Sequence, residues 1–177
     1  MGKGWTMTRG CTLVLGGARS GKSGFAQRLA EAGGGPLVYV ATAQAFDAEM
    51  ADRIARHRAD RGPRWTTVDA PHDLPDAIAG LRGGGVMLAD CLTLWLSNRM
   101  LADADMEMEI AALAAAIGQA DGHVILVSNE VGSGIVPETP MGRLFRDHAG
   151  RANQAVAAVA DRVALVIAGL PLWLKGG

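Results

Sequence analysis

Residues 16–23 form an eight-residue run, GGARSGKS, that satisfies the pattern G-x-x-x-x-G-K-S/T. An apolar, strand-like segment at residues 11–15 precedes this run, and a segment with helical spacing at residues 21–32 follows it. Glycines allow the chain to curl so that several backbone N–H groups point inward, and the start of the following helix adds its partial positive charge. The sequence therefore predicts a polyphosphate-binding loop between a strand and a helix.

The residue types in this loop indicate a nucleoside triphosphate with its magnesium ion. Lys22 is expected to reach the β- and γ-phosphates, and the Ser23 hydroxyl is expected to ligate Mg²⁺. A glycine-rich turn that binds nothing is the alternative, and the order of strand, motif and helix argues against it. The guanine-binding motif N-K-x-D is absent, so these residues alone do not indicate GTP. The predicted nucleotide-binding residues of the loop are Gly16, Gly17, Ala18, Arg19, Ser20, Gly21, Lys22 and Ser23.

Short apolar segments alternate with segments of helical spacing along most of the chain, which predicts a parallel sheet wrapped by helices. The strand segments are almost continuously apolar, as expected for strands covered on both faces. We therefore expect an α/β fold of the P-loop NTPase class, with a mostly parallel sheet and helices on both faces. The expected strands are residues 11–15, 37–41, 65–68, 86–89, 124–128 and 163–168. The expected helices are residues 21–32, 47–60, 74–81, 106–120 and 141–160.

The length of 177 residues suits one domain, at about 100–200 residues per domain. We expect residues 1–10 to form a flexible lead-in and residues 11–177 to form the domain. The 17 basic and 18 acidic side chains give a net charge of −1, which argues against nucleic-acid binding. No apolar stretch approaches the ~20 residues that span a bilayer, so no membrane span is expected. Cys11 and Cys91 are expected to be buried, reduced thiols, which favours a cytoplasmic protein.

Two acidic residues follow predicted strands. Asp90 closes the strand at residues 86–89, and Glu130 follows the strand at residues 124–128. Ligands of open α/β sheets lie at the carboxyl ends of the strands, so both carboxylates are expected to face the triphosphate. Asp90 is predicted to bind the nucleotide and its Mg²⁺, as strand-end aspartates do in P-loop proteins. A helix cap or a solvated side chain is the alternative at both positions, and either carboxylate could be the base of a kinase reaction.

A histidine stands in a strongly basic segment. Residues 53–64 contain five arginines and one aspartate, a net charge of +4 in a chain whose total is −1. Guanidinium groups bind polyphosphates through paired hydrogen bonds, and nearby positive charge favours the neutral form of imidazole. The neutral ring has a lone pair free to attack phosphorus, so His57 is a candidate nucleophile. A solvated basic helix face with an incidental histidine is the alternative.

Several sequence blocks resemble those of the bifunctional adenosylcobinamide kinase/adenosylcobinamide-phosphate guanylyltransferase family of cobalamin synthesis. They lie in the family's order along nearly the whole chain, and the blocks around His57 and after residue 128 are specific to the family. The resemblance implies a RecA-like P-loop fold that assembles as a homotrimer. It also implies that the partner is a small corrinoid, adenosylcobinamide. The blocks are residues 16–23, 39–42, 47–50, 53–58, 90–98, 129–138 and 146–154.

The resemblance further implies two reactions, with GTP, ATP and Mg²⁺ as cofactors. A nucleoside triphosphate gives its γ-phosphate to the aminopropanol hydroxyl of adenosylcobinamide. GTP then guanylylates a histidine with release of pyrophosphate, and the GMP passes to the new phosphate to give adenosylcobinamide-GDP. His57 matches the guanylylated histidine, and Lys22 is expected to act in both reactions. The family's other nucleotide contacts match Ala41, Thr42, Ala43, Arg58, Ala59, Asp60, Arg61 and Asp69, with Asp69 standing where glutamate is usual.

Two other functions fit the same residues. The first is a single-activity kinase of a small metabolite, in which His57 only binds phosphate. The second is a nucleotide-dependent switch whose basic segment, residues 53–64, docks an acidic partner.

Overall fold

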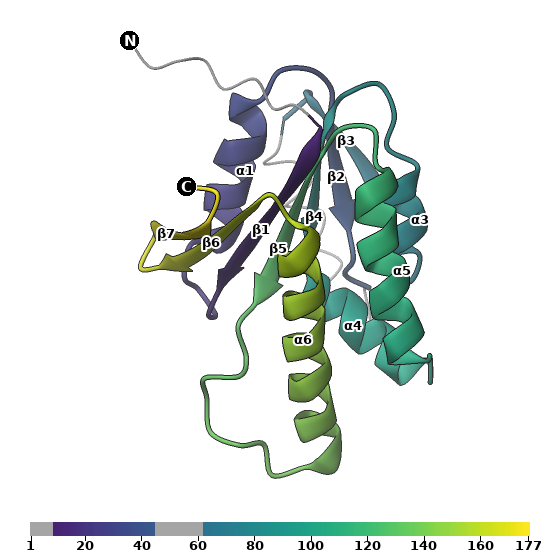
Figure 1. Cartoon of the computed structure of the whole chain (residues 1–177), viewed down its shortest axis with the longest axis vertical. Coiled ribbons are helices and arrows are strands. Elements are labelled where there is room, and N and C mark those ends of the chain that lie inside the picture. The colour runs from purple at the N-terminus through teal and green to yellow at the C-terminus, as the bar shows by residue number, and fades with distance from the viewer. Residues whose placement is uncertain (1–8, 45–61) are drawn as a thin grey trace.

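The computed structural model describes residues 9–44 and 62–177, which form a sheet with helices on both faces (Figure 1). The sheet has seven strands in the order β3-β2-β4-β5-β1-β6-β7, all parallel except β7, which runs antiparallel to β6. The expected fold class is confirmed. The strands are β1 (Gly10–Gly16), β2 (Leu37–Ala41), β3 (Trp65–Asp69), β4 (Val86–Asp90), β5 (His123–Asn129), β6 (Arg162–Ile167) and β7 (Leu170–Lys175). The helices are α1 (Lys22–Ala32), α3 (Leu74–Ala79), α4 (Leu92–Leu101), α5 (Met106–Gln119) and α6 (Pro140–Val159).

The two faces of the sheet are covered by different helices (Figure 1). Side chains of α3, α4, α5 and α6 pack on one face in a core that includes Leu13 and Leu126. Side chains of α1 pack on the other face against Val14 and Val127. Successive residues of β1 and β5 therefore point into different cores, which explains why these strands are continuously apolar in sequence.

Two elements were missed from the sequence. The helix α4 is separated from the end of β4 by one residue and buries Leu92, Trp95 and Leu96, which have the i, i+3, i+4 spacing of a helix face. The strand β7 contains Pro171, which weakened the strand pattern. Proline is tolerated there because β7 is the outermost strand and has a partner on one side only.

The other boundaries agree within a few residues. The first strand begins at Gly10, inside the expected lead-in, because Gly10 pairs with His123 of β5. The sixth expected strand ends at Ile167, since Ala168 and Gly169 have positive φ values and form the turn into β7. The expected helix at residues 47–60 and the first eight residues of the lead-in lie outside the described residues.

Candidate active site

The phosphate loop connects the central strand β1 to the start of α1. Gly21 has φ 91° and precedes the first residue of α1, Lys22. No side chain caps this helix start, and its first turn contains no acidic residue. The first backbone N–H groups of a helix have no partner within the helix and bind anions readily. The predicted loop is therefore shaped to bind phosphate.

Two glycines of the loop are required by close contacts. A Cβ atom on Gly16 would lie 2.7 Å from the carbonyl oxygen of Val166, and one on Gly21 would lie 3.0 Å from the Cα of Gly169. The backbone N–H of Gly169 donates to the carbonyl of Ser20 at 2.8 Å. The β6–β7 turn thus holds the loop in place from one side.

Lys22 and Ser20 present polar atoms within this loop. The Lys22 side chain is buried, and its Nζ donates to the carbonyl oxygen of Gly17 at 3.1 Å, so the ammonium group lies over the loop. The Ser20 Oγ is buried and has no hydrogen-bond partner in the part of the chain that the structure describes. A buried hydroxyl left unpaired costs about 1–3 kcal/mol. A phosphate oxygen at the loop would accept a hydrogen bond from the Lys22 ammonium group.

The predicted residues of the neighbouring strands meet at the same edge of the sheet. Ala41 at the end of β2 is in register with Asp69 of β3 on one side and Asp90 of β4 on the other. Thr42 and Ala43 directly follow Ala41. Adjacent strands are about 4.8 Å apart, so these backbone positions form one short row. The strand β5 lies between β4 and β1, which places Asp90 two strands from the phosphate loop.

Glu130 lies closer to the phosphate loop than Asp90 does. Its backbone N–H donates to the carbonyl of Gly16 at 3.1 Å, and the preceding residue, Asn129, is in register with Gly16. The Glu130 side chain is exposed, and its Oε1 accepts a hydrogen bond from the Gly132 N–H at 2.6 Å. The carboxylate is thus oriented by the chain that follows it.

A buried polar network, not predicted from the sequence, joins these strand ends. The Thr42 hydroxyl accepts from the Cys91 N–H and donates to the Cys91 carbonyl, both at 2.9 Å. Asn98 of α4 donates from its Nδ2 to the carbonyls of Thr42 and Pro71, both at 2.9 Å. Since Pro71 follows β3 and Thr42 follows β2, Asn98 fixes the exits of two strands. In the sequence, the only sign of this role was that Asn98 is a polar residue within an otherwise apolar segment.

We expect Asn98→Leu to lower the free energy of unfolding by about 2–4 kcal/mol, because two buried carbonyls lose their donor. Denaturant unfolding measures the change. Ser97→Ala, one residue earlier in the same helix and with no side-chain hydrogen bond to the described residues, is the matched control and is expected to change stability by less than about 0.5 kcal/mol. An equal effect of the two substitutions would contradict this role of Asn98.

The two cysteines are free and buried. Burial, with a smaller contribution from the Asp161 carboxylate, raises the pKa of the Cys11 thiol to about 12. Burial is also the largest cause of the raised pKa of Cys91. Both groups are therefore protonated at neutral pH, and neither has the character of a nucleophile.

The remaining candidate groups are placed as follows. His123 is buried, and its Nε2 lies 2.9 Å from the Thr12 hydroxyl in the core. Within residues 9–44 and 62–177, no three His, Cys, Asp or Glu side chains are grouped so that they could hold a metal ion, and no helix is long and apolar enough to cross a bilayer. The predicted residues outside the described part of the chain are His57, Arg58, Ala59, Asp60 and Arg61.

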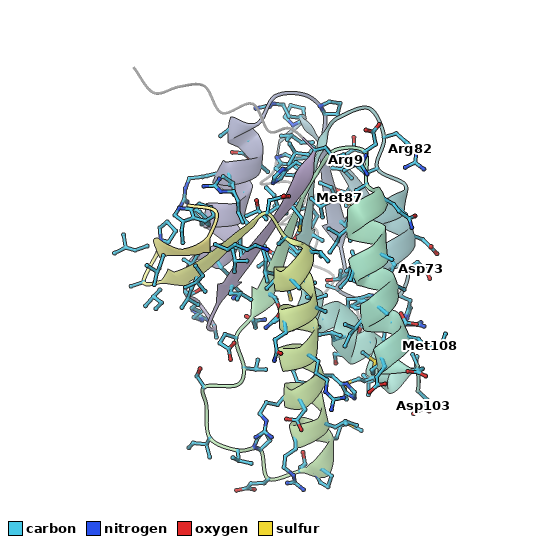
Figure 2. The ribbon with its side chains drawn as sticks, in the orientation of Figure 1. Arg9, Asp73, Arg82, Met87, Asp103 and Met108 are labelled. Atoms are coloured by element: carbon cyan, nitrogen blue, oxygen red, sulfur yellow. The ribbon has the colours of Figure 1, made fainter. Side chains whose placement is uncertain are left out.

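Two arginines lie away from this edge. Figure 2 shows Arg9 and Arg82 at the end of the sheet where the strands begin. Arg9 donates to the carbonyl of Gly118 at 2.7 Å, and Arg82 donates to the carbonyls of Ala79 and Leu81. These arginines bind carbonyls at the C-terminal ends of α5 and α3 and do not contribute to the phosphate site.

Comparison with known proteins gives matches over almost the whole chain. The family model for cobinamide kinase / cobinamide phosphate guanyltransferase matches residues 12–174. A Pseudomonas aeruginosa protein named bifunctional adenosylcobalamin biosynthesis protein CobP is 47% identical over 167 residues, which are 93% of this chain and 96% of that protein. An Escherichia coli protein named bifunctional adenosylcobalamin biosynthesis protein CobU is 40% identical over 179 residues, which are 92% of this chain and 98% of that protein.

Solved structures with similar folds have much lower sequence identity. The flagellar accessory protein FlaH from Methanocaldococcus jannaschii has a TM-score of 0.54 at 13% identity, over 96% of this chain and 80% of that one. The RadB recombinase has a TM-score of 0.52 at 14% identity, over 90% of this chain and 75% of that one. At such identities the likeness concerns the fold alone, and it confirms the RecA-like architecture.

Proposed function

The chain belongs to the cobinamide kinase / cobinamide phosphate guanyltransferase family, and on this basis we propose that it phosphorylates adenosylcobinamide and then converts the product to adenosylcobinamide-GDP. The phosphate loop carries the first reaction: Lys22 and the N–H groups at the start of α1 bind the triphosphate of the donor. In the second reaction the same loop binds GTP. The observation that best supports this function is that the family model matches residues 12–174, a range that includes the phosphate loop and the start of α1.

His57 is the residue that receives GMP in this proposal. Its nitrogen forms a bond to the α-phosphorus of GTP as the bond to the β-phosphate oxygen breaks, and pyrophosphate leaves. The phosphate of the corrinoid then displaces the imidazole, which forms the final P–O bond and restores the histidine. Covalent catalysis divides one transfer between two anions into two steps, and the arginines of residues 53–64 stabilise the charge in each.

Magnesium fits the oxygen groups at this edge of the sheet. The Ser23 hydroxyl stands in the first turn of α1, and the Asp90 carboxylate ends β4 at the same edge. Hydroxyl, carboxylate and phosphate oxygens are the ligands that Mg²⁺ prefers. When bound, the ion neutralises charge on the phosphates. The family resemblance also supports GTP as the guanylyl donor, GTP or ATP as the phosphoryl donor, and a homotrimer in the cytoplasm.

Labelling with nucleotide tests this function. The protein is incubated with GTP labelled at the α-phosphate, denatured and tested for bound label. We expect the protein to retain label that is released by acid and is stable to base, as is typical of a phosphoramidate. A separate assay should show phosphorylation of adenosylcobinamide. Phosphorylation without label would identify a single-activity kinase. Nucleotide binding without either reaction would identify a switch.

A further inference from the structure

A groove of about 410 Å³ lies between α6 and the β6–β7 hairpin. Its sheet residues include Leu15 and Val163, which pack in the core on the α6 side, so the groove lies on the face of the sheet opposite α1. Pockets for small ligands have volumes of about 300–1,000 Å³. The lining residues are Leu15, Glu130, Gly150, Asn153, Gln154, Ala157, Val163, Leu174 and Lys175.

One end of this groove adjoins the phosphate loop. Leu15 is the residue before Gly16, and the Glu130 N–H donates to the Gly16 carbonyl at 3.1 Å. The other end is closed by Lys175, whose Nζ donates to the carbonyls of Ala157 and Ala158 at 3.1 and 3.2 Å. The groove therefore extends from the phosphate loop along the side of α6.

The groove is separate from the residues that the proposed nucleotide site uses. Those residues belong to the phosphate loop, the start of α1 and the ends of β2, β3 and β4. The groove instead contains Glu130, Gly150, Asn153 and Gln154, which lie in the two family-like blocks at residues 129–138 and 146–154. These two blocks have no role in nucleotide binding in the proposed function.

We propose that the groove binds the aminopropanol arm of the corrinoid, with its hydroxyl at the Glu130 end; this inference rests on the proposed function. The volume suits an arm of the corrinoid rather than its macrocycle. Gln154 is exposed and makes no side-chain hydrogen bond to the described residues, so its amide is free to bind a polar group of the arm. The apolar side chains of the groove contact the hydrocarbon part.

An apolar strip continues from the groove and offers a surface for the macrocycle. Leu174 lines the groove, and Leu172 and Leu170 follow on the same face of β7 because side chains alternate along a strand. Leu170 is 72% exposed, and its partner across the hairpin, Ile167, is 61% exposed. Exposed apolar patches of this kind mark binding surfaces. A large planar ligand that enters the groove by one arm would cover this strip.

In this arrangement Glu130 accepts the proton of the arm. The hydroxyl oxygen attacks the γ-phosphorus, the bond to the β-phosphate oxygen breaks, and the nucleoside diphosphate leaves while the Glu130 carboxylate takes the proton. Glu130 is better placed than Asp90, because Asp90 lies on β4, beyond β5, and does not line the groove. The hydrogen bond from the Gly132 N–H to Oε1 orients the carboxylate.

Gly150→Phe tests the groove. The Cβ position of Gly150 meets no atom within 4 Å, so a side chain there can extend into the groove. We expect the KM for adenosylcobinamide to rise by about tenfold or more, with labelling by GTP retained because that step needs no corrinoid. Gly118→Phe, at an exposed glycine of α5 that is equally open, is the matched control and should behave as wild type.

Two further variants complete the experiment. Gln154→Trp also fills the groove from an exposed helix position and replaces Gly150→Phe if that variant fails to fold. Glu130→Gln should lower the kcat of corrinoid phosphorylation by about 100-fold or more, with labelling by GTP retained. An unchanged KM in the folded groove variants would overturn the groove as the corrinoid site, and an unchanged kcat in Glu130→Gln would overturn its role as base. If wild-type protein fails to phosphorylate adenosylcobinamide, the proposed function is wrong, and this inference falls with it.

Discussion

Lys22→Ala is expected to lower both corrinoid phosphorylation and labelling by GTP by about 1,000-fold, the scale on which charged groups stabilise phosphoryl transfer. Lys22 is the buried cation of the phosphate loop, and its Nζ already lies within hydrogen-bond distance of the loop backbone. In the proposed function, both reactions place a triphosphate on that backbone. A single substitution should therefore abolish two reactions that differ in the phosphorus attacked. Initial rates with adenosylcobinamide and α-labelled GTP measure the two losses.

Arg28→Ala is the matched control for Lys22→Ala. Arg28 lies on the same helix and carries the same charge, but its side chain is exposed. If the general positive charge of α1 stabilised the phosphates, both substitutions would reduce activity. If direct contact with Lys22 stabilises them, only Lys22→Ala will reduce activity. Unfolding curves for the two variants show whether the fold is retained. Guanylylation at the wild-type rate in Lys22→Ala would show that GTP binds elsewhere during the second reaction.

The phosphate loop could be predicted from the sequence because its requirements are local. Strand, glycines, lysine and helix follow one another without interruption, as the motif requires. The contacts of Gly16 with Val166 and of Gly21 with Gly169 are long-range and are seen only in the structure. The layered α/β fold was also predictable, since continuously apolar strands alternate with helices. In both cases the information lies within a few neighbouring residues.

The sequence predicted that strand-end residues face the triphosphate, but it could not show which strand ends are neighbours, because that depends on strand order. Tens of residues separate Ala41, Asp69 and Asp90 in the sequence. No local sequence pattern indicates that β2 lies between β3 and β4. Because β5 lies between β4 and β1, Glu130 at the end of β5 adjoins the phosphate loop, whereas Asp90 stands one strand further along the same edge. The sequence left these two carboxylates equivalent as candidate bases.

The groove between α6 and the β6–β7 hairpin was not predicted from the sequence, for a different reason. One of its walls belongs to β7, and Pro171 weakened the strand pattern of that segment. The buried network was missed because Thr42 and Asn98 are uncharged residues within apolar surroundings. Such side chains become recognisable only when the carbonyls that they satisfy are seen, since the hydrogen bonds join segments distant in sequence.

His57→Ala is expected to abolish the covalent label, by at least about 1,000-fold, since without the imidazole no P–N bond can form. The residues that carry the kinase reaction remain, so corrinoid phosphorylation should persist. His148→Gln is the matched control: this histidine lies on α6, outside the proposed nucleotide site, and its variant should label as wild type. His123 is enclosed in the core beside Thr12 and is a poor alternative acceptor. Peptide mass spectrometry of labelled wild-type protein locates the GMP, and an adduct on any residue other than His57 would refute the assignment.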